Sequence, residues 1–173
     1  MRRFTTPLVL AVALLLPGLA RAHGTAANVN DSDKDFLNKA AQGNMAEVKM
    51  GQLAATHAQS AAVKSFGERM VKDHTKAVDE LKALATKKSV TIPTDISADQ
   101  QKKYDDLAKL SGADFDKAYM DEMIKDHDQD VSEFQDAAKS AKDKDIRNLA
   151  AKLLPTLKSH QKMAHSGNLN KSM

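Results

Sequence analysis

Apolar residues recur every three to four positions along four long stretches of the chain. That spacing places them on one face of a helix, because successive helical residues are rotated by about 100°. The pattern predicts long helices over 31–58, 60–88, 114–141 and 143–164, and a shorter helix over 97–110. The apolar faces carry Phe36, Ala40, Gly51, Ala54 and Ala58; Val63, Met70, Ala77 and Leu81; Met120, Met123, Phe134, Ala138 and Ala141; and Ile146, Leu149, Leu153, Leu157 and Ala164.

Short breaks separate these helices. Pro93 keeps residues 89–93 extended, because proline and the residue before it disfavour helix, and Ser111-Gly112 ends the short helix. Pro155 falls inside the last helix and is expected to kink it. Two tight hairpins joined by a long connection are the ferritin-like form of the four-helix bundle, so we predict an all-α, ferritin-like fold. A plain up-down bundle with a decorated middle loop is the rival arrangement.

The first 22 residues have the parts of a secretory signal peptide. Two arginines precede an apolar run over 8–16, and residues 20–22 form a small-x-small cleavage site. A membrane anchor is the alternative, but a Pro-Gly pair ends the run well short of the ~20 residues that a span needs. We therefore predict export, a periplasmic location that is at most peripheral to the cell envelope, and no transmembrane segment in the mature chain.

The chain then divides into a leader and one domain. We predict a signal peptide over 1–22, a flexible lead-in over 23–31, a bundle domain over 32–165 and a frayed tail over 166–173. The chain contains no cysteine, so in an oxidising compartment the fold is held by packing without disulfides.

The basic charge of the chain belongs to its leader. The formal net charge is +3, and the leader holds three arginines and no acidic residue. Without them, basic and acidic residues balance. Aromatic residues, on which bases could stack, make up only 4% of the chain. We therefore predict no nucleic-acid partner, and the sequence indicates no particular protein partner.

Each long helix carries one ionisable residue on its apolar face. These are Glu47, His74, His127 and His160, in chain order. They lie at similar depths from the hairpin tips, so they could meet in one layer of the core. Three imidazoles and a carboxylate suit one transition-metal ion, namely zinc, iron or copper. The alternative is a hydrogen-bonded polar cluster that fixes the register of the bundle.

An internal echo links the second and third long helices. Met70-Val-Lys-Asp-His74 recurs as Met123-Ile-Lys-Asp-His127, so each histidine has a methionine one turn before it. Such methionines usually fill core space, but as ligands they would favour copper. The aspartate before each histidine points elsewhere and could orient a histidine on a neighbouring helix, although a solvated charge is the simpler interpretation.

Two other histidines are weaker candidates. His57 lies at the edge of the first apolar face, where a surface position is expected, and His23 would be the first residue after cleavage. A terminal amine and imidazole could chelate copper, but on a flexible segment the position is more simply incidental.

A wider set of residues gives the chain a family resemblance. The set comprises Asp35-Phe36, Glu47-Val48, Asp73-His74, Leu110-Ser-Gly112, Phe115-Asp116, Leu154-Pro155 and His160. It resembles the bacterial domain-of-unknown-function 4142 family over about residues 33–165. The resemblance implies an exported, ferritin-like helical protein and brings no settled activity with it.

The sequence departs from the di-iron ferritins in one respect. Those proteins place Glu-x-x-His on two helices, whereas Val71, Ile124 and Leu157 stand three positions before the histidines here. A carboxylate-bridged iron pair is therefore not expected, and neither is an enzyme, since phosphate-loop and nucleophile motifs are absent. We predict a metal-binding protein for storage, buffering or stress protection. The alternative is a non-catalytic structural or interaction module of the cell envelope.

Overall fold

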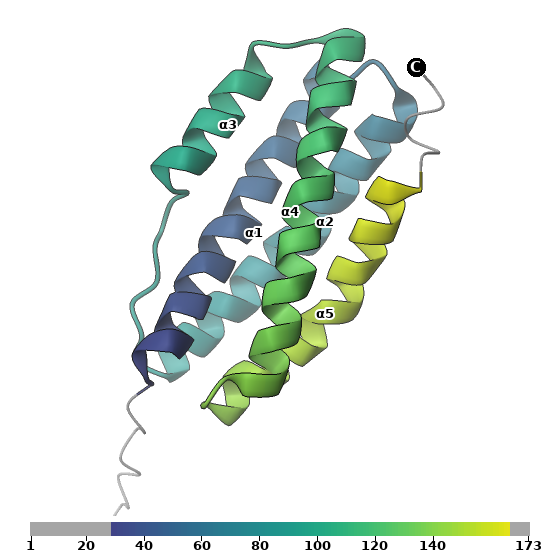
Figure 1. The fold of residues 1–173 in the computed structure, drawn as a ribbon. Coiled ribbons are helices and arrows are strands. Elements are labelled where there is room, and N and C mark those ends of the chain that lie inside the picture. The colour runs from purple at the N-terminus through teal and green to yellow at the C-terminus, as the bar shows by residue number, and fades with distance from the viewer. Residues whose placement is uncertain (1–28, 167–173) are drawn as a thin grey trace, which may run out of the picture.

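The computed structural model describes residues 29–166, which form five helices and no strand. The four long helices lie side by side, and the short one packs outside them (Figure 1). The all-helical prediction is confirmed for these residues. The helices are α1 (Asp31–His57), α2 (Ala61–Lys87), α3 (Ala98–Ala108), α4 (Gly112–Ser140) and α5 (Lys144–His165).

Two antiparallel hairpins, α1–α2 and α4–α5, build the body of the fold. Helix α1 also packs against α4, and α2 packs against α5. The connection from α2 to α4 returns to the opposite end of the molecule, so α2 and α4 run in the same direction (Figure 1). Helix α3 lies in this connection and packs on α1 and α4. The long connection between the second and third long helices therefore contains a helix, as the sequence predicts.

Side-chain caps mark where α1, α2 and α5 begin. Ser60 and Asp143 accept hydrogen bonds from backbone N–H groups at the starts of α2 and α5. At α1 the cap is Asn30, whose side chain accepts from the N–H of Asp33 at 3.1 Å. Helix α5 continues through Pro155.

The predicted terminal segments fall mostly outside the described residues. This holds for the signal peptide over 1–22, most of the lead-in and the tail from 167 onward. Val29, near the end of the predicted lead-in, is 4% exposed and belongs to the core. Within the described part of the chain, every helix is too short or too polar to cross a membrane.

Two hydrophobic clusters fill the bundle, and a polar layer lies between them. On α2, Met70 belongs to one cluster and Leu81 to the other, with His74 between them. On each of the other three long helices, the buried apolar residues likewise pass from one cluster to the other near the predicted ionisable residue. The candidate site therefore lies in mid-bundle, enclosed by apolar residues at both ends.

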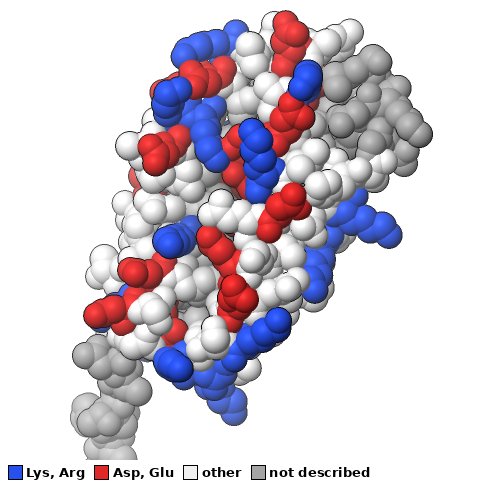
Figure 2. All heavy atoms as spheres, viewed as in Figure 1, with Lys and Arg blue, Asp and Glu red and all other residues white. Residues whose placement is uncertain are grey.

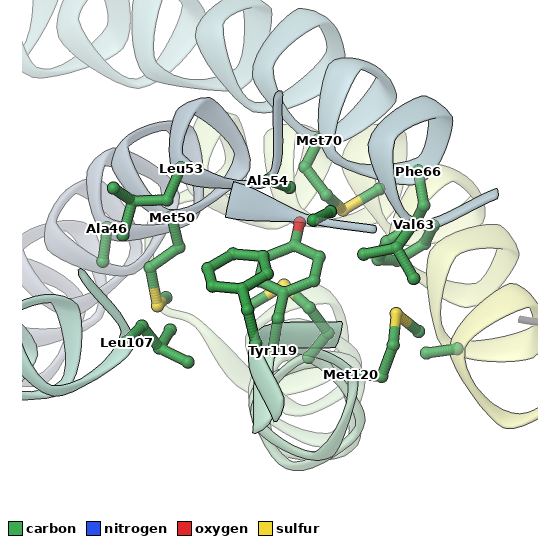
Figure 3. Close-up of a cluster of buried hydrophobic side chains, with 14 residues drawn as sticks. Ala46, Met50, Leu53, Ala54, Val63, Phe66, Met70, Leu107, Tyr119 and Met120 are labelled. Carbon is green, nitrogen blue, oxygen red and sulfur yellow. The ribbon is translucent and has the colours of Figure 1, made fainter. Parts of the chain in front are cut away.

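Met70 and Met123, whose role the sequence left open, lie in the first of these clusters. Both side chains are fully buried. Figure 3 shows Met70 with Met50 and Met120 around Tyr119. Flexible thioethers fill irregular space between aromatic rings well, so these surroundings favour a packing role for both methionines.

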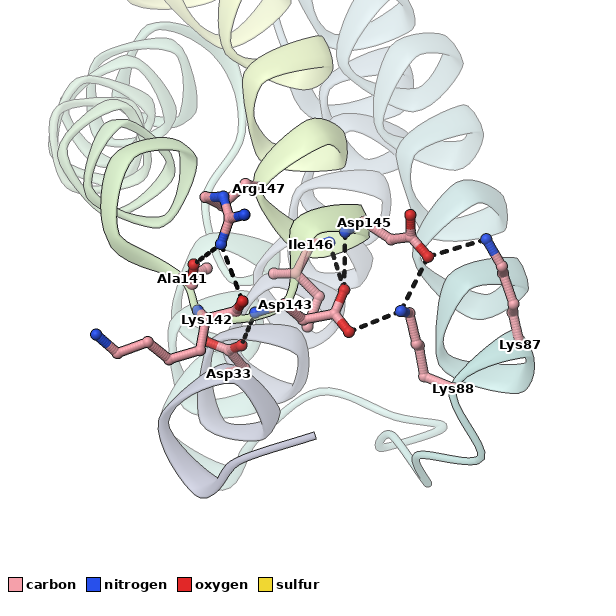
Figure 4. Close-up of polar contacts among 9 residues, drawn as sticks. All are labelled: Asp33, Lys87, Lys88, Ala141, Lys142, Asp143, Asp145, Ile146 and Arg147. Atoms are coloured by element: carbon pink, nitrogen blue, oxygen red, sulfur yellow. Dashed lines mark hydrogen bonds and ion pairs between the residues drawn. The ribbon is translucent and has the colours of Figure 1, made fainter. Parts of the chain in front are cut away.

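Each hairpin carries a buried aspartate that is hydrogen-bonded to the turn of the other hairpin. The Asp33 carboxylate, at the start of α1, accepts from two N–H groups of the α4–α5 turn at 3.1 and 2.7 Å (Figure 4). The Asp116 carboxylate, near the start of α4, accepts from two N–H groups of the α1–α2 turn at 3.0 and 2.8 Å. Asp116 thus serves a turn at the end of the bundle.

Charged side chains cover the outside of the bundle. On the face shown in Figure 2, positive and negative groups are interspersed. Charged groups of the bundle also form ion pairs, such as Lys88 with Asp143 and Asp145 at 2.6 and 2.9 Å (Figure 4). This face therefore lacks the continuous positive field that a nucleic-acid backbone would need.

Helices α1 and α2 approach each other closely at two glycines. A Cβ atom placed on Gly67 would lie 2.5 Å from the Ala54 Cβ and 2.9 Å from the Gly51 carbonyl oxygen. A Cβ on Gly51 would lie 2.7 Å from the Gly67 carbonyl oxygen. Only glycine permits this separation, so both residues set the spacing of the hairpin that carries Glu47 and His74.

Gly67→Ala is expected to lower the free energy of unfolding by about 1–3 kcal/mol, because the new methyl group overpacks the α1–α2 contact. Gly43→Ala is the matched control. A Cβ there would meet only the Asp130 Oδ1, at 3.9 Å, so this variant should gain about 0.5–1 kcal/mol from helix propensity. Denaturant unfolding of both variants measures the difference. Equal stability of the two would contradict the close-contact argument.

Candidate metal centre

The structure brings the four predicted residues together in one buried layer. Glu47 comes from α1, His74 from α2, His127 from α4 and His160 from α5. Their exposed fractions are 1%, 1%, 0% and 0%. The arithmetic of helix faces and depths therefore identified the four side chains that meet inside the bundle.

The three imidazole rings form a compact triangle. Their centroids are 5.6 Å apart for His74 and His127, 5.1 Å for His74 and His160, and 5.3 Å for His127 and His160. Each ring offers a nitrogen that lies within 4.8 Å of the nitrogens offered by the other two. An ion bound to three nitrogens at ~2.0–2.1 Å would hold them about 3.3–3.6 Å apart. Side-chain shifts of about 1 Å would therefore close the triangle on one ion.

One nitrogen of each histidine faces an acceptor. The His74 Nδ1 lies 2.8 Å from the Asn44 Oδ1 and 2.7 Å from the Glu47 Oε2. The His127 Nδ1 lies 2.8 Å from the carbonyl oxygen of Met123. A carbonyl oxygen cannot donate, so the His127 Nδ1 carries the hydrogen.

The same argument assigns the other two rings. The Asn44 amide nitrogen donates to the carbonyl oxygen of Ala40 at 2.7 Å, which leaves its Oδ1 as an acceptor for the His74 Nδ1–H. The His160 Nε2 lies 2.9 Å from the Asp73 Oδ2 and donates to it. In its neutral form, each of the three histidines therefore has a defined tautomer.

The remaining nitrogens have no hydrogen-bond partner. These are the Nε2 of His74, the Nε2 of His127 and the Nδ1 of His160. In the assigned tautomers each carries a lone pair. Buried polar atoms without a partner are rare and call for an explanation, and three in one cluster form the donor set that a transition-metal ion prefers.

Glu47 lies on the outer side of this triangle. Its Oε2 contacts the Nδ1 of His74, and its Oε1 lies 3.3 Å from the Nδ1 of His127. Burial raises the pKa of this carboxyl, but His127 and His74 outweigh burial and lower the pKa to about 2. Glu47 is therefore an anion that touches the protonated nitrogens, which is how a carboxylate orients metal-bound histidines.

Asp73 does the same for His160. The sequence offered two interpretations of this aspartate, a solvated charge or a group that orients a histidine on a neighbouring helix. Its Oδ2 contacts the His160 Nε2 at 2.9 Å and the Arg69 Nε at 3.3 Å. Burial opposes ionisation of Asp73, while hydrogen bonds from His160 and Arg69 lower its pKa. Asp73 is thus a charged positioning group.

His160 stays neutral well below physiological pH. Burial lowers the pKa of its imidazole to about 4, and nearby His74 contributes in the same direction, against the opposing hydrogen bond to Asp73. Its free nitrogen is therefore available to a metal at neutral pH.

The other histidines lie away from this layer or outside the described residues. The His57 Nδ1 is 2.8 Å from the Thr56 hydroxyl at the end of α1, and His23 lies outside the described residues. Asn44 was not predicted, because an asparagine near an apolar face carries no charge that marks it. Tyr119 was also missed. Its hydroxyl is buried and has no partner, and burial, followed by the negative charge of Glu47, raises its pKa.

A cluster of three further carboxylates lies near Glu47, on the side where α3 covers α1 and α4. Asp126, Asp130 and Glu133 line a cavity of about 440 Å³ there, together with Glu47. Burial, and then the charges of Glu47, Asp126 and Glu133, raise the pKa of Asp130 well above its usual range. The folded state therefore binds a proton at Asp130 over a pH range in which the unfolded chain has lost it.

Stability should accordingly fall as pH rises through that range, because the unfolded state then gains from ionisation that the folded state resists. Asp130→Asn is expected to raise the free energy of unfolding by about 1 kcal/mol at pH 8 and by less at pH 4. Asp79→Asn, at an exposed position of α2, should change little at either pH. Denaturant unfolding at the two pH values tests this, and an equal effect of Asp130→Asn at both would contradict the raised pKa.

Residues 18–166 match a family described as a domain of unknown function, DUF4142. The chain belongs to the DUF4142 family. The match covers all of the residues that the structure describes, and it confirms the resemblance drawn from the residues alone. No curated protein sequence matches the chain.

Several solved structures share the fold. A DUF305 fragment from Deinococcus radiodurans has a TM-score of 0.71 at 12% identity, covering 83% of this chain and 98% of the fragment. CopM in its Cu(I)-bound form has a TM-score of 0.67 at 16% identity, covering 82% of this chain and 98% of CopM. CopM in its Cu(II)-bound form also has a TM-score of 0.67, at 15% identity, covering 80% of this chain and 97% of CopM. At these identities the likeness establishes the fold alone.

Proposed function

We propose that this DUF4142 protein binds one transition-metal ion through His74, His127 and His160. The observation that carries the proposal is that each of the three buried imidazoles has a ring nitrogen without a partner, and that the three rings offer nitrogens within 4.8 Å of one another. Glu47 contacts the Nδ1 atoms of His74 and His127, and Asp73 contacts the Nε2 of His160. The sequence counted Glu47 among the ligands, whereas its contacts favour a positioning role beside a three-histidine site.

Copper is the ion to test first. Imidazole nitrogens suit zinc, copper and iron, so the donor set alone admits all three. CopM, which shares the fold, has solved structures in a Cu(I)-bound and a Cu(II)-bound form, and this favours copper. In the proposed role, an exported, non-catalytic protein with a ferritin-like arrangement of hairpins stores or buffers the ion in the periplasm, or protects against metal stress.

A structural role for the polar layer is the second candidate. Its support is that each histidine already donates one good hydrogen bond, to Asn44, Met123 or Asp73. In this interpretation the polar layer fixes the register of the helices in an interaction module. Replacing all three histidines by leucine would then leave function intact and raise stability, as for other buried polar layers.

The deciding experiment is a metal titration of the untagged protein. Apo protein is titrated with Cu(II) and Zn(II), and with Cu(I) under reducing conditions, each against a competing chelator. The expected result is one equivalent of one ion that survives dialysis and raises the unfolding temperature, because an ion that binds only the folded state stabilises it. A stable protein that retains no ion would overturn the proposal in favour of the structural role.

A further inference from the structure

The ring nitrogens without a partner, which we call the free nitrogens, are enclosed by protein. His74, His127 and His160 are at most 1% exposed, and their free nitrogens have almost no solvent-accessible surface. The two apolar clusters lie on either side of this layer along the bundle. An ion held by the free nitrogens would therefore be out of contact with bulk water.

A cavity between α2 and α5 borders this layer at a different edge of the rings. His74 and His160 line the cavity together with Asn44 and Asp73. Asn44 contacts the Nδ1 of His74 at 2.8 Å, and Asp73 contacts the Nε2 of His160 at 2.9 Å. These are the hydrogen-bonded nitrogens of the two rings. Water in the cavity would therefore meet the edges of the rings that face away from an ion held by the triangle.

The described part of the chain also lacks a fourth carboxylate, imidazole or thiolate ligand. Within residues 29–166, no further histidine, aspartate or glutamate joins the three-histidine group, and the chain contains no cysteine. Glu47 and Asp73 contact the hydrogen-bonded nitrogens of the rings, so neither faces the ion. The buried side chains one turn before two of the histidines are Met70 and Met123, and any contact from them would come from a soft thioether.

The carboxylates that contact the imidazoles differ in how their charge is balanced. The charge of Asp73 is offset by the Arg69 guanidinium, at 3.3 Å. Within residues 29–166, Glu47 forms ion-pair contacts only with two of the histidines. With the histidines neutral, one monovalent ion would therefore balance Glu47. A divalent ion would leave a positive charge uncompensated in a layer removed from water, and burying such a charge is costly.

From these observations we infer that the triangle prefers a monovalent d¹⁰ ion, Cu(I) or Ag(I), to the divalent ions Cu(II) and Zn(II). The inference rests on the proposed metal site and names the class of ion that it takes. Zinc sites almost always have four ligands, and Cu(II) favours square-planar or tetragonal surroundings. Each of these ions would lack a ligand in the triangle. A monovalent d¹⁰ ion is stable with three nitrogen donors, so the divalent ions bind the same triangle more weakly.

The reduction potential of bound copper measures this preference directly. Untagged protein is loaded without oxygen with one equivalent of Cu(I), and its potential is measured by titration with redox mediators. Tighter binding of Cu(I) than of Cu(II) raises the potential above that of aqueous copper, by about 59 mV for each tenfold difference in affinity. A preference of about a hundredfold or more is expected, which is a rise of at least about 120 mV. In competition with Cu(I), Ag(I) should displace it and equimolar Zn(II) should not.

A substitution that supplies a fourth ligand should reduce the preference. Leu157 is 3% exposed and precedes His160 by three residues on α5, so the two lie on one face of the helix. Leu157→His should raise Zn(II) affinity and lower the reduction potential by about 59 mV or more, which is a tenfold gain for Cu(II) over Cu(I). Leu154→His makes the same substitution at a partly buried position of α5 on a different face and should behave like the unaltered protein.

X-ray absorption of the Cu(I)-loaded protein should show three nitrogen ligands. A fourth nitrogen or oxygen ligand would overturn the inference and leave the metal site standing. So would one equivalent of bound copper with a potential at or below that of aqueous copper, or tighter binding of Zn(II) than of Cu(I). If the new imidazole of Leu157→His binds Zn(II) without a gain in affinity, a missing donor is not what disfavours the divalent ions, and the inference is overturned. If no ion binds, the proposed metal site itself fails.

Discussion

His127→Asn is expected to weaken metal binding by more than about a hundredfold, more than is usual for loss of a group outside the ligand set. The asparagine amide can still donate near the position of the Nδ1, toward the carbonyl oxygen of Met123 that now accepts at 2.8 Å. It has no equivalent of the Nε2, the atom without a partner. The variant thus removes the proposed ligand atom while sparing the hydrogen bond. Chelator competition with Cu(II) and Zn(II) measures the loss.

His160→Gln makes the matching change in α5. Glutamine can donate to Asp73 near the position of the Nε2 and lacks the Nδ1. The controls are His165→Ala, which removes a half-exposed imidazole paired with Asp128, and His23→Ala, which tests chelation near the predicted cleavage site. Neither control should change the stoichiometry. Unchanged affinity in both His127→Asn and His160→Gln, with circular dichroism showing folded protein, would remove the metal site and leave the structural role.

The helix faces could be predicted because they depend on local spacing. Glu47, His74, His127 and His160 occupy the apolar faces of their own helices, and one packing arrangement buries all four faces together. A rotation of about 100° per residue is therefore enough to identify the inward groups. The two hairpins could be predicted from the same pattern and from the short breaks that separate the helices.

Which ring nitrogen points where could not be predicted, because it depends on partners far apart in the chain. Asp73 reaches His160 across the α2–α5 contact, and Asn44 reaches His74 across the α1–α2 contact. Asparagine is usually found on surfaces, so Asn44 carries no local signal, and for Asp73 the sequence left a positioning role and a solvated charge both open. Only the tertiary structure therefore shows which nitrogen of each histidine is hydrogen-bonded and which one is left for a metal.

Corresponding residues of the two hairpins are separated by a constant number of positions in the sequence. Asp33 and Asp116 clamp the opposite hairpin's turn in the same way, and they are separated by the same number of residues as the cap positions Ser60 and Asp143. The same offset pairs Glu47 with Asp130. Each hairpin thus brings one of this pair of carboxylates to the middle of the bundle, but of Glu47 and Asp130 only Glu47 contacts the imidazoles.

Glu47→Gln distinguishes the ligand set predicted from the sequence from the one that the contacts favour. As a positioning group, Glu47 stabilises the Nδ1–H tautomers of His74 and His127 from 2.7 and 3.3 Å and increases the basicity of the opposite nitrogens. Its replacement should then lower copper affinity by about 10–100-fold, with one equivalent still bound. As a ligand, its loss should match that of His127→Asn and change the electron paramagnetic resonance parameters of bound Cu(II).

Asp73→Asn is the natural comparator, since Asp73 contacts only one of the three imidazoles, that of His160. It should weaken binding in the same direction as Glu47→Gln and by a smaller factor, because one imidazole instead of two loses its carboxylate. Glu68→Gln removes an exposed carboxylate from the same helix as His74 and should leave affinity unchanged. Equal losses in Glu47→Gln and His127→Asn would return Glu47 to the ligand set. Equal affinity in Glu47→Gln and the unaltered protein would show that the imidazoles hold their orientation without it.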